Sequence, residues 1–317
     1  MQSNSKVQRP GRHSADWSLI ADVLRGLKST PKQLSPTYFY DERGSELFER
    51  ICAVPEYYVT RTETGILESH AAGIAGLIPD DALLVELGSG ASTKTRLLLD
   101  RLPQLAAYVP VDISRSHLLD AARRVAESYP HLEVLPVCAD FTQPFPLPSP
   151  RRKSSRVVVF FPGSTIGNFD APEAVALLRS LRGVAGALLI GYDLVKDPGI
   201  LERAYNDAAG VTAAFNLNVL VRLNRELGAT FHPGAFRHEA LWCPADSRVE
   251  MHLISSVAQH VTIAGETISF AAGERLVTEH CHKYSPAGFA ALAACAGWTA
   301  SQTWTDERGY FNVQYLE

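Results

Sequence analysis

The sequence predicts an α/β fold in which helices cover a largely parallel sheet, with a smaller α+β unit inserted into it. Short apolar runs alternate with helical patterns between residues 82 and 191. Strands that alternate with helices are typical of right-handed crossovers and a parallel sheet. The alternation stops near residue 198 and resumes close to the C-terminus. A chain of 317 residues, 46% of them hydrophobic, can bury the cores of two such units.

The segment on which this interpretation depends runs from residue 83 to residue 92, with the sequence LLVELGSGAS. An apolar strand ends near Glu86, a turn with Gly88 and Gly90 follows, and a helical pattern begins at Thr93. Glycine lets the backbone approach a ligand closely because it has no Cβ. Thr93 stands where a dinucleotide-binding loop has its third glycine, which weakens that interpretation. The pattern suits the E/D-x-G-x-G loop of S-adenosylmethionine (SAM) methyltransferases instead.

The elements follow in a regular order. Helices are expected first, over 16–27 and 62–70. Five parallel strands are then expected over 82–87, 107–112, 133–138, 156–161 and 186–191, separated by helices over 93–101, 115–127 and 171–182. The inserted region reads as helix over 198–229 and as strands over 248–256, 261–270 and 276–284. A helix over 286–296 and two final strands, 299–304 and 310–316, complete the chain.

A terminal antiparallel hairpin after five parallel strands is typical of the Rossmann-like sheet of class I SAM methyltransferases. The sixth strand of a NAD-binding fold is usually parallel. We therefore expect a SAM-binding domain over 63–196 and 285–317, and a smaller α+β substrate-binding cap domain over 16–62 and 197–284. Residues 1–15 are polar and are expected to form a flexible tail.

Composition argues against several kinds of partner. The formal net charge of −4 leaves no basic surplus to neutralise phosphates, so we expect no nucleic-acid partner. No apolar stretch reaches the roughly 20 residues of a membrane span, and the N-terminus lacks the apolar core of a signal peptide. Five scattered cysteines without a C-x-x-C pair fit a reducing compartment. We expect a cytoplasmic monomer without a membrane partner.

Acidic residues stand near the carboxyl ends of three successive predicted strands, at Glu86, Asp112 and Asp140. Open α/β sheets bind ligands in the crevice outside these strand ends. A carboxylate at Asp112 can accept hydrogen bonds from both hydroxyls of a ribose, and capping of the following helix is the alternative role. Asp140 is placed to receive an adenine amino group, and the ring of Phe141 to cover the adenine face.

Further motifs are spread along the chain. They are FYDERGSELF (39–48), PEYYVTRTE (55–63), ELGSG (86–90), GSTIGN (163–168), DLVKD (193–197), AYNDAAGVTAAFN (204–216) and FAAGE (270–274). Together these motifs resemble the histidine Nα-methyltransferases of ergothioneine biosynthesis, and the likeness extends from about residue 16 to the C-terminus. The resemblance implies three SAM-dependent methylations of the α-amino group of L-histidine, which give the trimethylated product hercynine.

The resemblance also implies roles for individual residues. Those implied to bind SAM are Gly88, Lys94, Asp112, Asp140 and Phe141. Those implied to bind histidine are Tyr57, Asn168, Tyr205, Met251, Glu279 and Cys281. Asn168 and Tyr205 would hold its carboxylate, whereas Met251 and Glu279 would contact its imidazole. Tyr40 and Gly163 are implied near the reacting amino group. Cys281 departs from the family, which has a serine at this position.

No metal is expected. Strand alternation over 276–284 places Glu279 and Cys281 on one side, and His280 and His282 on the other. These four residues therefore do not converge on one ion, and the two histidines are interpreted as surface or packing residues. The aromatic rings of the N-terminal motifs are expected to cover the ligand edge of the sheet, with ordinary core packing as the alternative for Phe39 and Phe48.

Two alternatives to histidine methylation remain. The chain can be an N-methyltransferase of another aromatic amino acid such as tryptophan, or a SAM-binding protein without catalytic activity. In the enzyme interpretation, the methyl group passes in line from a sulfonium to a neutral amine that the protein must position. Methylation of a tertiary amine leaves a fixed cation, which the rings of Tyr40, Phe48 or Tyr57 can stabilise through cation–π contact.

Overall fold

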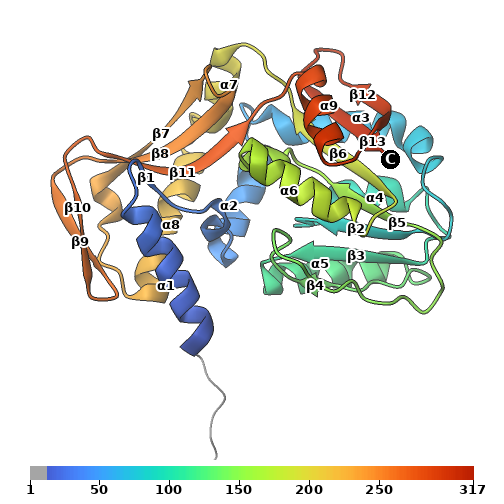
Figure 1. The fold of residues 1–317 in the computed structure, drawn as a ribbon, viewed down its shortest axis with the longest axis horizontal. Coiled ribbons are helices and arrows are strands. Elements are labelled where there is room, and N and C mark those ends of the chain that lie inside the picture. The colour runs from blue at the N-terminus through green and yellow to red at the C-terminus, as the bar shows by residue number, and fades with distance from the viewer. Residues whose placement is uncertain (1–12) are drawn as a thin grey trace, which may run out of the picture.

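The computed structural model describes residues 13–317, and residues 1–12, most of the expected tail, lie outside this range. The described chain contains three sheets, and the two larger ones lie side by side (Figure 1). One has seven strands in the order β12-β13-β6-β5-β2-β3-β4, and the other has four in the order β1-β11-β8-β7. A two-stranded hairpin, β9-β10, extends from the smaller sheet. None of the described helices is long and apolar enough to cross a membrane.

The seven-stranded sheet has the strand order expected of a class I methyltransferase. Its parallel strands are β2 (Leu83–Leu87), β3 (Ala107–Asp112), β4 (Val137–Cys138), β5 (Val157–Phe161) and β6 (Ala187–Asp193). The antiparallel hairpin consists of β12 (Ala300–Thr305) and β13 (Phe311–Leu316), and β13 pairs with β6. The α/β class and the final hairpin are confirmed. β4 is shorter than expected, with only an isolated bridge at Val134 before it.

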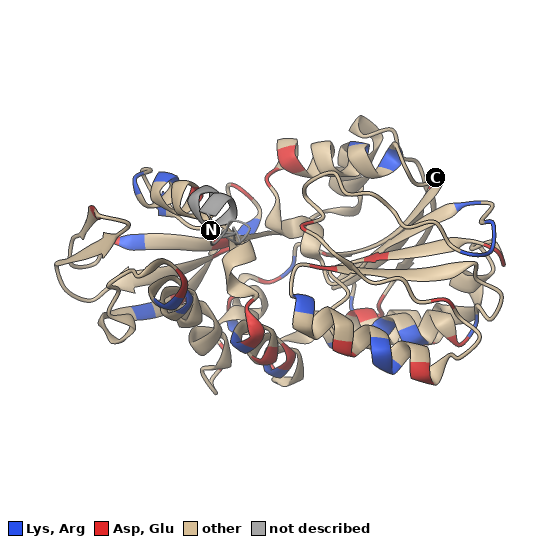
Figure 2. Ribbon diagram, turned by 90° about the horizontal axis from the view of Figure 1, so that it is seen from below, with Lys and Arg blue, Asp and Glu red and all other residues tan. Residues whose placement is uncertain are grey.

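Helices cover both faces of this sheet (Figure 2). The helices of one face are α3 (Tyr58–Ala75), α4 (Thr93–Leu99) and α5 (Arg115–Ser128), and those of the other are α6 (Ala171–Arg182) and α9 (Pro286–Cys295). Along β2, Leu84 packs into one hydrophobic cluster, whereas Leu83 and Val85 pack into the other. Burial on both faces explains why the strand reads as a continuous apolar run.

We refer to the four-stranded sheet and the helices packed on it as the cap. Its strands are β1 (Lys32–Gln33), β7 (Phe236–Cys243), β8 (Arg248–Ser255) and β11 (Arg275–His282). Its α-helices are α1 (His13–Leu27), α2 (Glu42–Ala53), α7 (Pro198–Tyr205) and α8 (Val211–Leu227). One hydrophobic cluster is continuous from the large sheet into the cap, since it contains Leu84 and Tyr108 together with Phe215 and Met251.

The cap differs from the sequence prediction at two places. The helix expected over 198–229 is interrupted between α7 and α8, where Gly210 has a φ of +69° and the Asp207 carboxylate accepts the amide hydrogens of Val211 (2.8 Å) and Thr212 (2.7 Å). The strand expected over 261–270 is the hairpin β9 (Gln259–Ile263) and β10 (Glu266–Phe270). Its two-residue turn has positive φ at Ala264 and Gly265, which suits a twisted hairpin. β7 was not among the strands predicted.

We predict that Asp207→Ala destabilises the protein by about 2 kcal/mol, because it leaves two amide groups at the buried start of α8 without their acceptor. Urea unfolding followed by circular dichroism measures this loss. The matched control is Asp197→Ala, which removes a single bond to Ile200 (3.1 Å) at the exposed start of α7 and should cost less. Equal losses in the two variants would show that the carboxylate of Asp207 does not fix the helix break.

Candidate active site

Three of the expected SAM-binding residues meet at the carboxyl ends of β2, β3 and β4. Gly88 has a φ of +66°, and a Cβ at this position would lie 3.8 Å from the ring of Phe141. The Asp112 carboxylate accepts hydrogen bonds from the amides of Gly90 (3.0 Å) and Ser114 (2.9 Å). Asp112 therefore shapes the glycine turn as well as the start of the next helix. Each carboxylate oxygen has a second lone pair, so Asp112 can still accept ribose hydroxyls.

Asp140 and Phe141 lie in the loop that follows β4. The Asp140 carboxylate accepts the amide (2.9 Å) and hydroxyl (2.7 Å) hydrogens of Thr142, which fixes the local turn. The ring of Phe141 packs edge-to-face against Phe161, with 5.5 Å between ring centroids. The loop thus presents a carboxyl group and an apolar ring beside the glycine turn. A hydrogen-bond acceptor beside an apolar ring fits an adenosine moiety.

Glu86 differs from the expectation that it faces the crevice. Its side chain is buried, and its carboxylate accepts a hydrogen bond from the Tyr108 hydroxyl, which in turn lies 3.0 Å from the hydroxyl of Ser92. Burial raises the pKa of Glu86 to about 7. Hydrogen bonds from Glu86 through Tyr108 to Ser92 therefore connect the glycine-rich loop to β3.

Lys94 connects the glycine-rich loop to Gly163 through Glu63. Its ammonium group forms an ion pair with Glu63, which is fully buried on α3. The Glu63 carboxylate also accepts the amide hydrogen of Gly163, at 3.0 and 2.9 Å for its two oxygens. Gly163 has a φ of +83°, and a Cβ there would lie 3.7 Å from the Lys94 nitrogen. Sequence reasoning quoted Glu63 only as the end of a motif and assigned it no role.

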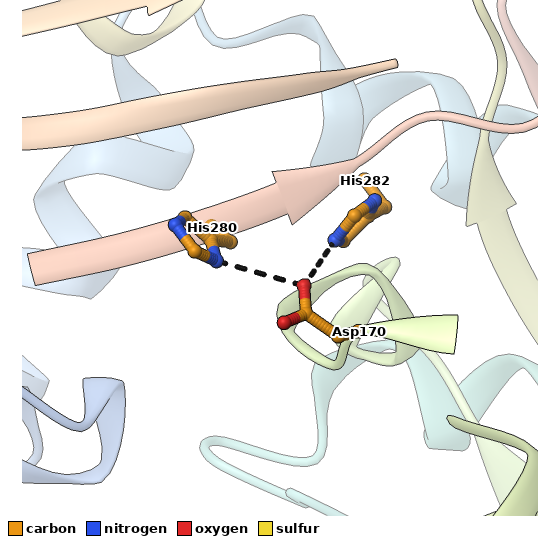
Figure 3. A group of neighbouring side chains, drawn as sticks. All are labelled: Asp170, His280 and His282. Carbon is orange, nitrogen blue, oxygen red and sulfur yellow. Dashed lines mark hydrogen bonds and ion pairs between the residues drawn. The ribbon is translucent and has the colours of Figure 1, made fainter. Parts of the chain in front are cut away.

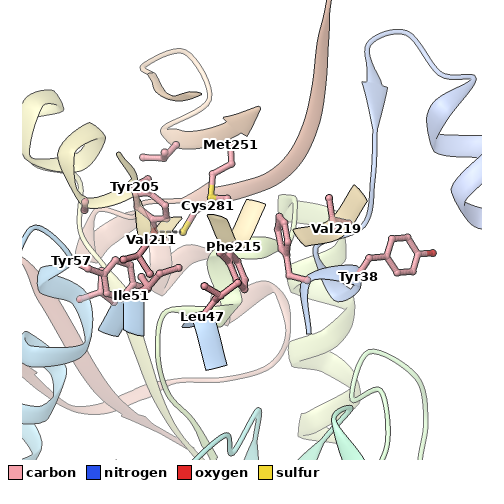
Figure 4. Close-up of a cluster of buried hydrophobic side chains, with 14 of the residues drawn as sticks. Tyr38, Leu47, Ile51, Tyr57, Tyr205, Val211, Phe215, Val219, Met251 and Cys281 are labelled. Atoms are coloured by element: carbon pink, nitrogen blue, oxygen red, sulfur yellow. Dashed lines mark hydrogen bonds between the residues drawn. The ribbon is translucent and has the colours of Figure 1, made fainter. Parts of the chain in front are cut away.

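A pocket between the large sheet and the cap brings the other expected residues together. Figure 4 labels four of them, Tyr57, Tyr205, Met251 and Cys281, within the surrounding hydrophobic cluster. All eight side chains or backbones implied for catalysis and substrate binding line it, together with Phe48 and Phe215. The eight are Tyr40, Tyr57, Gly163, Asn168, Tyr205, Met251, Glu279 and Cys281. They come from seven segments of the chain, among them the 3-10 helix η2 (Thr165–Asn168). The convergence of residues so distant in sequence makes this the candidate active site.

Aromatic rings form one wall of this pocket. Tyr40 packs edge-to-face against Phe48 and Phe215, with 5.9 Å between centroids in each case, and Tyr57 packs edge-to-face against Tyr205 at 6.0 Å. Burial, followed by the nearby Glu279 carboxyl group, raises the pKa of Tyr40 well above its ordinary value. The phenol is therefore neutral at physiological pH. Phe39, by contrast, is a core residue stacked on Phe215.

Glu279 and Met251 lie side by side in the pocket lining. They are paired in register between β11 and β8, just after an irregularity in pairing between Val277 and Glu279. Such an irregularity re-aims the side chains that follow it. Glu279 is only 9% exposed, and burial raises its pKa to about 7 against the opposing effect of Lys283. The predicted alternation is confirmed, because Glu279 and Cys281 line the pocket while His280 and His282 face Asp170 outside it.

Lys283 is a buried residue in contact with the pocket residues Tyr205 and Cys281, and the sequence did not predict a role for it. Its buried ammonium nitrogen lies 2.8 Å from the Tyr205 hydroxyl, 2.9 Å from the Cys281 sulfur and 3.1 Å from the Asp193 carboxylate. Burial alone lowers the pKa of Lys283, but Cys281 and the Asp193 carboxylate outweigh burial and hold it above the ordinary value. The only signal in the sequence was the motif that begins at Asp193.

Comparison with known proteins decides the family. A family model described as histidine-specific, SAM-dependent methyltransferase matches residues 19–317. The chain belongs to this family. The histidine N-alpha-methyltransferases of Mycolicibacterium smegmatis and Mycobacterium tuberculosis are 44% and 43% identical over 309 and 311 residues. These alignments cover 95% of both chains in the first case and 96% in the second. "Ergothioneine biosynthesis protein 1" of Neurospora crassa is 32% identical over 286 residues, which are 88% of this chain and 32% of that protein.

The methyltransferase is thus a SAM-dependent enzyme, and both the predicted family and the predicted cofactor are confirmed. The glycine turn, the Asp112 carboxylate and the ring of Phe141 are a set of groups that fits SAM. A Cβ at Gly88 would extend to 3.8 Å from the Phe141 ring, so glycine leaves space between the turn and the ring.

The raised pKa of Glu279 predicts a pH-dependent difference in stability. Between pH about 4.5 and pH about 7, the unfolded chain has released the Glu279 proton while the folded protein still holds it. The contribution of this group is therefore complete below pH about 4.5 and is lost as the pH rises through about 7. From pH 5 to pH 8, Glu279→Gln should gain roughly 1–3 kcal/mol of unfolding free energy relative to wild type.

Urea unfolding of both proteins at the two pH values measures this gain. Glu86 titrates in the same window, but it is present in both proteins and cancels in the difference. A constant difference across the pH range would contradict the burial of an ionisable Glu279.

Proposed function

We propose that this enzyme transfers methyl groups from SAM to the α-amino group of L-histidine and yields hercynine, a step of ergothioneine biosynthesis. The combination of polar groups in one pocket supports this function most directly. A buried carboxyl group, Glu279, lines the pocket together with two hydrogen-bonding side chains, Asn168 and Tyr205. The names of the mycobacterial and fungal relatives support the same substrate and pathway.

Glu279 suits an imidazole. A buried carboxyl group needs a hydrogen-bond partner, and an imidazole N–H supplies one where an apolar side chain does not. A site of this kind rejects ligands without the donor, because its own polar group is then left unpaired. Tryptophan also carries an N–H, but its larger ring would collide with Met251, which is paired with Glu279 across the strands.

Tyr205 and Asn168 suit an amino-acid carboxylate. The Lys283 ammonium donates a hydrogen bond to the Tyr205 oxygen at 2.8 Å, and the Tyr205 hydroxyl also lies 2.9 Å from the Cys281 sulfur. Because sulfur is a weak acceptor, the Tyr205 hydroxyl hydrogen can turn to a stronger one. Burial raises the pKa of Tyr205 well above its ordinary value, so the hydroxyl remains a donor. A carboxylate placed beside it can then accept this hydrogen together with an amide hydrogen of Asn168. The positive charge of Lys283 also favours an anionic group beside Tyr205.

The reacting amine would lie near Tyr40 and Gly163. SAM, when bound, supplies a methyl group activated on a sulfonium. The chain must hold a neutral amine in line with that group, and anchoring both the side chain and the carboxylate of the substrate fixes this alignment. The neutral phenol of Tyr40 can accept a hydrogen bond from the amine. The third methylation leaves a fixed cation, which the rings of Tyr40, Phe48 and Tyr57 can face.

The same proposal extends to the organisation of the chain. The large-sheet domain, 63–196 with 285–317, would bind SAM through Gly88, Lys94, Asp112, Asp140 and Phe141. The cap, 16–62 with 197–284, would supply most of the substrate contacts. We further propose that the enzyme works as a cytoplasmic monomer without a nucleic-acid partner. Light scattering of the purified protein tests the oligomeric state.

Purified protein with excess SAM should convert L-histidine to the Nα-trimethylated product, with both imidazole nitrogens unmodified, as tandem mass spectrometry will show. Glu279→Ala should lose histidine binding far more than SAM binding, because it removes the partner of the imidazole. Cys281→Ser, the control at the neighbouring pocket position, should bind histidine as tightly as wild type or more tightly, since a hydroxyl is the better hydrogen-bonding group. Faster methylation of tryptophan or tyrosine would overturn the substrate and leave the family intact.

Lys283→Met should raise KM for histidine by about tenfold or more, because Tyr205 then lacks the donor that orients it. The affinity for S-adenosylhomocysteine should stay unchanged. Lys196→Met is the matched control, since Lys196 contacts the other oxygen of the Asp193 carboxylate at 2.6 Å and donates its remaining hydrogen bonds to Tyr58 and Leu194, not to Tyr205. Both variants should lose stability, and only Lys283→Met should change KM. Equal KM values in the two variants would remove Lys283 from substrate binding.

A further inference from the structure

A second convergence of side chains lies on the outer face of β11, away from the pocket (Figure 3). His280 and His282 point from this strand toward Asp170, the residue that precedes α6. The Asp170 carboxylate oxygen lies 2.9 Å from Nε2 of His282 and 3.7 Å from Nδ1 of His280. The two imidazoles are 22% and 16% exposed, and Asp170 is 51% exposed. None of these residues takes part in the proposed methyl transfer.

The donor set and its spacing suit a transition-metal ion. Two histidines separated by one residue project from the same face of a strand, because side chains alternate along it. One donor atom from each of the three residues lies within 4.8 Å of the others. Tetrahedral zinc with bonds of about 2.0–2.2 Å holds its donors about 3.3 Å apart, so small side-chain rotations close the site. Imidazole with carboxylate is a ligand combination typical of zinc.

Glu250 adds a second feature of a metal site. It is paired with His280 across the strands, and its carboxylate lies 3.8 Å from Nε2 of His280, the nitrogen opposite the one that faces Asp170. Metal-binding histidines commonly donate their other ring N–H to a carboxylate, which fixes the orientation of the ring. His280 is thus flanked by Asp170 on one side and by an orienting carboxylate on the other.

Arg248 is the competing cation of this cluster. Its guanidinium lies 3.5 Å from the Asp170 carboxylate and 2.6 Å from that of Glu250. An ion bound to Asp170 would displace the first contact and leave the second in place. Arg248 should therefore weaken metal binding, and its removal should strengthen it.

We propose that Asp170, His280 and His282 bind one zinc ion, with water completing the coordination. The two histidines alternate along β11 with Glu279 and Cys281, and Asp170 follows Asn168 by two residues. Gly167 is already packed on this strand, since a Cβ there would lie 2.6 Å from the carbonyl oxygen of His282. The ion joins the segment that carries Asn168 to the strand that carries Glu279. It would thereby fix the distance between Asn168 and Glu279.

The test uses the full-length protein without an affinity tag, stripped of metal by a chelator. Titration calorimetry with Zn²⁺ should show one site, and Co²⁺ should give the intense visible absorption of a tetrahedral complex. Mg²⁺ and Ca²⁺ should not bind, because they prefer oxygen ligands.

His280→Gln and His282→Gln should each weaken Zn²⁺ binding by about 100-fold or more, and Glu250→Gln by roughly 10–100-fold. Arg248→Gln should tighten it. Zn²⁺ should raise the thermal midpoint of wild type and of Arg248→Gln, but not that of His280→Gln or His282→Gln at the same Zn²⁺ concentration.

His260→Gln is the control, since His260 is an exposed histidine on β9 that is hydrogen-bonded to Ser269 and lies outside the cluster. It should bind Zn²⁺ as wild type does. Unchanged S-adenosylhomocysteine affinity in every variant confirms that each one is folded. Absence of a Zn²⁺ site in wild type, or equal affinity in wild type and His282→Gln, would overturn the proposal and leave the cluster as a network of ion pairs.

Discussion

The buried ion pair between Lys283 and Asp193 is the interaction on which the pocket depends. Asp193 ends β6 of the large sheet, and Lys283 directly follows β11 of the cap. Backbone hydrogen bonds continue the connection, because the amide of Tyr284 donates to the carbonyl of Asp193 at 3.0 Å. A buried ion pair contributes little net stability, but removal of one partner leaves an uncompensated charge and costs about 3–5 kcal/mol. The pair therefore fixes how the two sheets meet more than it stabilises the fold.

The other polar groups around this pair are satisfied in turn. The hydroxyl of Tyr58 donates to the Asp193 carboxylate at 2.7 Å, and the Asp193 amide donates to the hydroxyl of Ser164 at 3.0 Å. Ser164 and Gly163 are adjacent residues of the loop that enters η2, so the Asp193 amide and the Glu63 carboxylate together hold this part of the loop. A fully satisfied buried network is rigid, and rigidity in the surrounding groups is what a site that aligns two reactants requires.

The sequence alone predicted most of the large sheet, because strands buried on both faces and a final hairpin leave strong periodic signals. It did not predict the break before α8 or the β9-β10 hairpin. Both depend on single turns, at Asp207 and at Ala264, inside apolar patterns that continue across them. The resemblance supplied the pocket residues, all of which the fold brings together. It did not supply Lys283, since a buried lysine is recognisable only from the carboxylate and hydroxyl that the fold places around it.

The continuous hydrophobic cluster from the large sheet into the cap has a consequence for how substrates reach the pocket. Swinging the cap away as a rigid body would divide this cluster and expose apolar side chains on both sides of the division. Exposure of that surface to water is costly at about 25 cal/mol per Å². Ligand exchange must then occur through local motion of the loops and rings at the pocket rim, while the two halves of the molecule stay together as one cooperative folding unit.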